Sequence, residues 1–207
     1  MTRTHYTIAW SYVLLCALFI GRAMSAKPSP APARLAPPSV PPPTSEVAWF
    51  RQAKPYCNSV EVQTLSQHVP PAPATTTGAG YHAACFALAG RIADARQIID
   101  RVRPAERAQA AGVVFDVGHP VADAGDDRSA GAIMELVIDY WPTNYMALYH
   151  AGMVEYMLGQ RKLARRNLEE FLKYYQQPDG WTANARAVLK RLDSPVEAPL
   201  ERLPDPR

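Results

Sequence analysis

The chain has 207 residues, enough for one domain with a sizeable hydrophobic core or for two small ones. Its formal net charge is +3, and without residues 1–26 the 22 basic side chains fall to 20 against 19 acidic ones. A nearly neutral chain argues against a general nucleic-acid binder, which needs a basic excess to neutralise phosphates. We therefore expect no nucleic-acid partner.

Residues 1–26 have the pattern of a signal peptide or an N-terminal membrane anchor. Arg3 precedes the apolar run IAWSYVLLCALFI, and small residues follow at 23, 25 and 26. This is the order of regions in a secretory signal, and the run is short for a bilayer span. Arg22 lies close to the expected cleavage point, which leaves an uncleaved anchor open. We expect an exported chain that is periplasmic or anchored facing outward, with no other membrane contact.

A proline-rich segment follows the signal, and a shorter one ends the chain. The stretch from 27 to 43 holds 8 of the 20 prolines, which lack the N–H group that helices and sheets require. We expect a disordered spacer and a disordered tail on either side of the folded part. The expected divisions are the spacer at 27–44, short helices and a loop at 45–75, a larger helical region at 76–178, a capping helix at 179–193 and the tail at 194–207.

Two cysteines, Cys57 and Cys85, remain beyond the export segment. An even number of cysteines in an oxidising compartment favours a disulfide. Closing a loop of this length would stabilise the fold by about 3 kcal/mol. The alternative is a pair of small buried thiols.

The periodic segments between Ser45 and Asp193 all have helical spacing, and no strand-like alternation of any length competes with them. A short helix is expected up to Lys54, and a second over residues 60–69, before a proline pair. Residues 71–80 contain prolines, threonines and glycines and are expected to form a loop.

The stretch GHPVADAGDD, residues 118–127, is expected to be a long turn between two helices. Its aspartates resemble a cation-binding loop, but their spacing is not that of an EF-hand. Asp126 or Asp127 is better explained as the N-cap of a helix that begins near Arg128.

Two helix pairs resemble each other at an offset of 69 residues. Gly90 aligns with Gly159 and Ala95 with Ala164, and apolar residues align after them, Ile99 with Leu168 and Val102 with Phe171. The offset is close to twice a period of about 34 residues. A middle pair is expected between them, with Gly112 aligned to Gly152 and residues 118–127 supplying about six surplus residues.

This pattern resembles the tetratricopeptide repeat family over about residues 76–178. The last repeat carries the resemblance best, through Leu148, Ala151, Gly152, Leu158, Gly159, Ala164, Leu168, Phe171 and Pro178. Glu155 departs from the family pattern, because an aromatic residue is usual there. The resemblance implies an all-α fold of about three TPR-like helical hairpins that form a short right-handed α-solenoid with a capping helix. A different helical-hairpin repeat is the alternative.

A stripe of methionines and tyrosines follows the first helix of the last repeat. The resemblance implies that first helices line the concave surface, which would make this stripe a ligand groove. Methionine and tyrosine suit an adaptable peptide-binding surface. The alternative is that a neighbouring helix buries the stripe as core. The stripe consists of Met146, Tyr149, Met153, Tyr156 and Met157.

No catalytic, phosphate-binding or metal-binding motif of known spacing is found in the sequence. We therefore expect no catalytic residue, no metal and no cofactor, and a non-catalytic scaffold in the cell envelope that binds a protein or peptide partner. One alternative is an accessory subunit of an envelope complex for secretion or wall assembly. The other is an enzyme that uses the 118–128 loop, with His119 and Asp123 as its acid/base pair.

Overall fold

The structure is a computed structural model that describes residues 43–194, and the regular structure in that range is entirely helical. The expected export segment, all but the last two residues of the proline-rich spacer, and the tail beyond Ser194 lie outside the described residues. No helix within the described range is long and apolar enough to cross a membrane. The all-α prediction is confirmed for the part of the chain that the structure describes.

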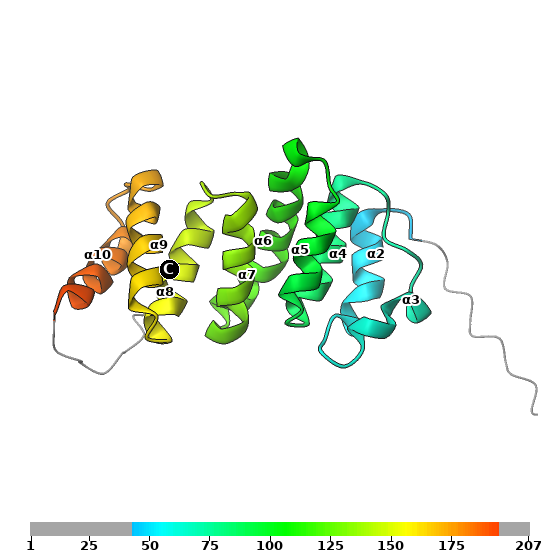
Figure 1. Ribbon diagram of the computed structural model, residues 1–207, viewed down its shortest axis with the longest axis horizontal. Helices are drawn as coiled ribbons and strands as arrows, with labels where there is room; N and C mark the ends of the chain where they lie inside the picture. The colour runs from blue at the N-terminus through cyan, green and yellow to red at the C-terminus, as the bar shows by residue number, and fades with distance from the viewer. Residues whose placement is uncertain (1–42, 195–207) are drawn as a thin grey trace, which may run out of the picture. The chain divides into compact units, whose positions relative to one another are not determined.

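The longer helices lie side by side in chain order, and each packs on the next one or two along the chain (Figure 1). Three of the shorter elements are 3-10 helices, labelled η. The elements are α2 (Glu46–Ala53), η1 (Lys54–Tyr56), η2 (Val62–Thr64), α3 (Leu65–His68), α4 (Thr76–Leu88), α5 (Ile92–Asp100), η3 (Pro104–Glu106), α6 (Arg107–Asp123), α7 (Asp127–Tyr140), α8 (Tyr145–Met157), α9 (Arg161–Tyr174) and α10 (Gly180–Asp193).

Three helix pairs, α4–α5, α6–α7 and α8–α9, each turn at a glycine with left-handed backbone. Their φ angles are 74° at Gly90, 80° at Gly125 and 73° at Gly159. Just beyond Gly159, the Gln160 N–H donates back to the Glu155 carbonyl at 2.7 Å, which satisfies a carbonyl at the helix end. A side chain would be strained at such a φ, so glycine is required. The turn predicted at Gly159 is confirmed, and the three glycines are 35 and 34 residues apart.

The loop predicted at 71–80 is too long, because α4 begins within it. The Thr75 hydroxyl accepts a hydrogen bond from the Gly78 N–H at 2.9 Å and caps the helix. Gly80 lies against α6, where an added Cβ would be 2.8 Å from the Ala110 carbonyl oxygen. The glycines therefore serve close packing inside a helix. The helix predicted at 60–69 is shorter and less regular than expected, since η2 and the single turn of α3 together cover 62–68.

The long turn predicted at 118–127 is wrong as well, because α6 continues to Asp123 with Pro120 inside it. Pro120 is exposed in the last turns, where a proline removes only one backbone hydrogen bond. Gly118 and Ala122 are buried, and their packing keeps this segment helical. The expected cap is confirmed for Asp126, whose carboxylate accepts a hydrogen bond from the Ser129 N–H at 3.2 Å.

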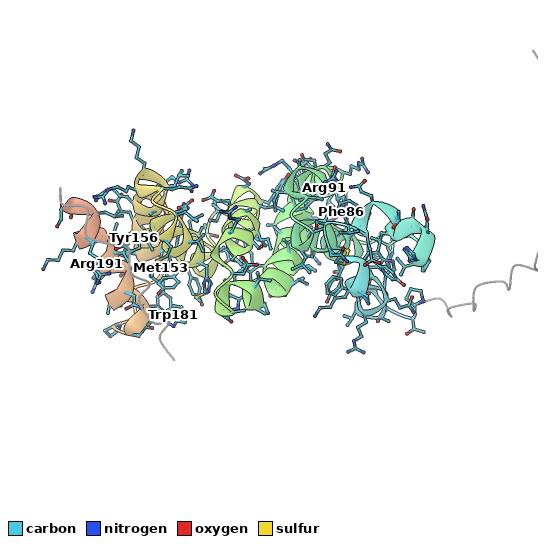
Figure 2. The ribbon with its side chains drawn as sticks, turned by 90° about the horizontal axis from the view of Figure 1, so that it is seen from below. Phe86, Arg91, Met153, Tyr156, Trp181 and Arg191 are labelled. Atoms are coloured by element: carbon cyan, nitrogen blue, oxygen red, sulfur yellow. A yellow bond between two sulfur atoms is a disulfide. The ribbon has the colours of Figure 1, made fainter. Side chains whose placement is uncertain are left out.

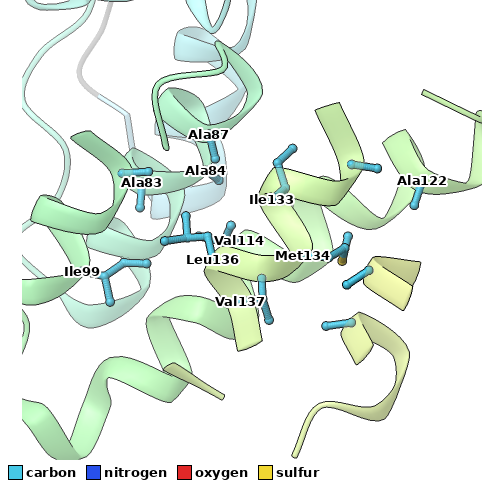
Figure 3. Close-up of a cluster of buried hydrophobic side chains, with 14 of the residues drawn as sticks. Ala83, Ala84, Ala87, Ile99, Val114, Ala122, Ile133, Met134, Leu136 and Val137 are labelled. Carbon is cyan, nitrogen blue, oxygen red and sulfur yellow. The ribbon is translucent and has the colours of Figure 1, made fainter. Parts of the chain in front are cut away.

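Small residues let successive helices approach closely. A Cβ added at Gly118 would lie 2.5 Å from the Ile133 side chain of α7, and one at Gly131 would lie 2.7 Å from Val154 of α8. Around these crossings, alanines of α4 and branched side chains of α5, α6 and α7 form a continuous core (Figure 3). The middle alignment from the sequence was therefore wrong, since Gly118 makes the close approach that Gly152 makes in the last pair.

Replacing Gly152 with alanine is expected to destabilise the fold by about 1–3 kcal/mol through overpacking. The added Cβ would lie 2.6 Å from Leu168 Cγ and 3.2 Å from the Leu168 backbone nitrogen. Gly112→Ala is the matched control, because its Cβ would meet only the Trp141 ring at 3.6 Å, an ordinary contact. Urea unfolding should show G112A as neutral or slightly stabilised. Equal decreases in the free energy of unfolding for G152A and G112A would contradict a close helix approach at Gly152.

Candidate functional site

The candidate site is a groove of about 590 Å³ between α2, α4 and α6. Its walls are largely apolar, with an exposed lysine and two exposed aspartates among its lining residues. Because its walls come from three helices, the groove exists only in the folded array. The residues that line it are Val47, Phe50, Lys54, Tyr81, Leu88, Asp116, Val117, Pro120, Val121, Ala124 and Asp126.

Three interactions fix α2 as one wall of this groove. The Phe50 ring stacks on Tyr81 of α4 with ring centroids 5.0 Å apart. Trp49 is almost fully buried, and its indole N–H donates to the Pro70 carbonyl at 2.8 Å. Cys57, just after η1, forms a disulfide with Cys85 of α4. The disulfide predicted from the cysteine count is thus present, and α2 is linked covalently to the array.

The groove combines an apolar surface with charges of both signs. Val47 is 44 % exposed, so its side chain is accessible within the groove. Lys54, Asp116 and Asp126 are exposed. Such a surface can bury apolar side chains of a partner while the charges set its orientation. The sequence analysis missed this site, because its residues are far apart in the chain.

The predicted methionine and tyrosine stripe lies in the core. Tyr149, Met153 and Tyr156 are buried, and Met146 and Met157 are half-buried. Figure 2 shows Met153 and Tyr156 on the side of α8 near Trp181. Helix α10 covers the stripe with a row of apolar side chains, Ala185, Val188, Leu189 and Leu192. The structure therefore supports the core alternative, and we do not retain the stripe as a ligand groove.

A buried carboxyl group, Glu155 of α8, lies between helices α7 and α9. The Asn167 side-chain amide of α9 donates to Glu155 at 2.9 Å and to Glu135 at 2.6 Å. Arg166 contacts Glu135 at 3.0 Å. Burial and the neighbouring Glu135 carboxylate raise the pKa of Glu155 to about 8. Glu155 is therefore largely protonated at neutral pH, and one of its oxygens has no hydrogen-bond partner among the described residues.

A second polar cluster joins α6 to α8. His119 Nδ1 lies 3.6 Å from an Asp123 carboxylate oxygen, one turn further along α6. His150 of α8 contacts the His119 ring with centroids 4.7 Å apart. Burial and the neighbouring His119 lower the pKa of His150 to about 4, so its ring is neutral at pH 7. The sequence analysis considered His119 and Asp123 together but missed His150.

The His119 and Asp123 pair, considered above as a catalytic acid/base pair, lies on a regular helix. Residues 118–123 belong to α6, and only Ala124–Asp126 separate α6 from α7. Comparisons with protein-family models, with characterised proteins and with solved structures found no significant match. The candidate site therefore depends on the geometry of this chain alone.

Glu155→Gln is expected to flatten the dependence of stability on pH. The pKa of Glu155 in the folded state, about 8, exceeds the ordinary value of 4.5. Between these values the unfolded chain releases a proton that the folded chain keeps, so stability falls as pH rises through that window. The amide stays neutral, so E155Q should melt at a higher temperature than the wild type at pH 8 and similarly at pH 4.5.

Glu169→Gln serves as the control in the same melting series, because Glu169 is exposed on the neighbouring helix and pairs only with Arg165 among the described residues. The melting temperature of E169Q should change with pH as that of the wild type does. Parallel curves for E155Q and the wild type would contradict a retained proton on Glu155.

Proposed function

We propose that the described residues form a short tetratricopeptide-like array of three helical hairpins. Buried small and apolar residues at fixed distances from the three turn glycines support this. Seven positions before each turn glycine is a small residue, which is Ala83, Gly118 and Gly152 in the three hairpins. Five positions after it is an alanine, Ala95, Ala130 and Ala164. Nine positions after it is a larger apolar residue, Ile99, Met134 and Leu168.

These positions correspond to the small residue of the first helix and the A-x₃-F spacing of the second helix in tetratricopeptide repeats. The period of 35 and 34 residues agrees with that family as well. Pro142, soon after α7, occupies the position of the proline that often ends a repeat. The array would end at α10, which covers the last hairpin.

The proposed function of the array is non-catalytic binding of a protein or peptide segment in the groove of α2, α4 and α6. The observation that carries this proposal is the groove itself, which leaves apolar side chains such as Val47 accessible. A volume of about 590 Å³ is sufficient for several apolar side chains of a bound segment. The function is argued from this site, because a fold alone does not determine function.

We place this function in the cell envelope. The Cys57–Cys85 disulfide supports an oxidising compartment, because such bonds are rare where glutathione keeps thiols reduced. The apolar run at 8–20, after Arg3, supports export.

An accessory subunit of an envelope complex is the second candidate. Leu158 and Leu163 remain exposed and line one pocket beside Glu155, on α7, α8 and α9, with no lining residue shared with the groove. Contact through this second surface would favour a subunit role over capture of a peptide in the groove.

Site-specific photo-cross-linking in cells that naturally express the chain tests the groove. A photoreactive residue at Val47 should give a discrete adduct whose partner is identified by mass spectrometry. The same residue at Val60, which is 82 % exposed and lies outside the groove, should give none. A probe at Leu163 tests the second surface, and adducts from Leu163 alone would overturn the groove in favour of the subunit role.

Val47→Asp should then weaken binding of the identified partner to the purified protein by at least about tenfold, since a buried unpaired carboxylate costs well over 1.4 kcal/mol. Val60→Asp introduces the same charge outside the groove and should leave affinity unchanged. Equal affinities for wild type and V47D, measured by calorimetry, would contradict the groove as the binding surface.

Alkylation and intact-mass analysis test the proposed compartment. In protein isolated from cell envelopes without reductant, Cys57 and Cys85 should resist alkylation, and a chain without residues 1–26, retained in the cytoplasm, should carry two reactive thiols. Reducing the disulfide should lower the free energy of unfolding by about 3 kcal/mol, because the unfolded chain regains loop entropy. Free thiols at both positions in envelope protein would contradict the proposal.

A further inference from the structure

The cluster of His119, Asp123 and His150 has the composition of a metal site. One possible ligand atom from each side chain lies within 4.8 Å of the other two. Two imidazoles with one carboxylate are a ligand set that suits Zn²⁺ and similar divalent transition ions. Helix α6 supplies two ligands one turn apart, and α8 supplies the third across the helix interface.

His150 gives independent evidence that this cluster faces a ligand. Its side chain is only 4 % exposed, and its Nε2 atom has no hydrogen-bond partner among the described residues. His119 Nε2 is also buried without a partner in that range. Buried polar atoms normally have hydrogen-bond partners, and a bound ion is one reason for an exception. Two such nitrogens in rings that touch each other therefore point to a shared ligand.

We propose that His119, Asp123 and His150 bind a divalent transition-metal ion, with Zn²⁺ as the representative ion. The ion would accept a lone pair from one nitrogen of each ring and from the Asp123 carboxylate. An ion here would link α6 to α8, which otherwise touch little, and would stabilise the array across its middle hairpin.

The geometry also defines how the site must adjust. Zn²⁺ binds imidazole nitrogen at about 2.0–2.1 Å, so tetrahedral ligand atoms lie about 3.4 Å apart. The ligand atoms here lie within 4.8 Å of one another, so these side chains must draw together by up to about 1.4 Å. Asp123 is half-exposed and can rotate freely, whereas aromatic rings hold His150. Three protein ligands leave at least one position open to solvent, as in catalytic rather than structural zinc sites.

Metal titration of the full-length chain, purified free of metal, tests this site. Zn²⁺ affinity is measured by calorimetry, and Co²⁺ is followed through the visible absorption of a tetrahedral site. His119→Gln and Asp123→Asn should each weaken Zn²⁺ binding by at least about tenfold, because losing an outer-shell partner alone costs about 10–100-fold. His68→Gln and Asp193→Asn change exposed residues of the same types, and these variants should bind Zn²⁺ as the wild type does.

Thermal melting gives a second readout. At a Zn²⁺ concentration that saturates the wild type, the melting temperature of the wild type and of both controls should rise. That of H119Q and D123N should rise less, because the stabilisation grows with the affinity of the folded state for the ion. Circular dichroism checks that each variant is folded before titration. The proposal would be overturned if the wild type bound Zn²⁺ no more tightly than an H119Q/D123N double variant. It would also be overturned if the two control variants lost as much Zn²⁺ affinity as H119Q and D123N.

Discussion

Close approach of neighbouring helix backbones is the constraint on which this array depends. At four helix crossings a glycine, Gly80, Gly118, Gly131 or Gly152, lies where an added Cβ would collide with a neighbouring helix. Helices that approach this closely gain dispersion contacts along their whole length. Small residues at the crossing therefore stabilise the fold by more than the burial of their own apolar surface would. The turns must also be tight enough to return the chain at that distance, which explains the three left-handed glycines.

The third hairpin departs from the apolar pattern of the first two in a coordinated way. Four residues before the turn glycine, the first two hairpins have Phe86 and Val121, whereas the third has Glu155. Eight residues after the turn glycine, the first two have Ile98 and Ile133, whereas the third has Asn167. The two polar residues are hydrogen-bonded to each other, so the substitution at one position is matched by that at the other. Their hydrogen bond links α8 to α9, and burial of the carboxyl group raises the pKa of Glu155 to about 8.

The two ends of the array differ in what they leave accessible. At the C-terminal end, α10 covers the methionine and tyrosine stripe of α8 and removes it from solvent. At the N-terminal end, α2 is fixed by Phe50 and the disulfide, but it stands far enough from α6 to leave a groove. Helix α10 thus covers a surface at one end of the array, whereas α2 forms one wall of a groove at the other end. The accessible surface depends on these flanking helices more than on the hairpins.

The sequence by itself determined the helical class and the turn at Gly159, because both depend on local backbone preferences. It narrowed the helix cap to Asp126 or Asp127 and favoured a disulfide between Cys57 and Cys85, and the structure decided both. Only the tertiary structure decided that Pro120 lies within a helix, that Met153 and Tyr156 are core, and that His150 meets His119. A solvent-facing stripe and a buried one have the same spacing in a helix. Which of them is buried depends on where a later helix packs, and that is a property of the folded chain.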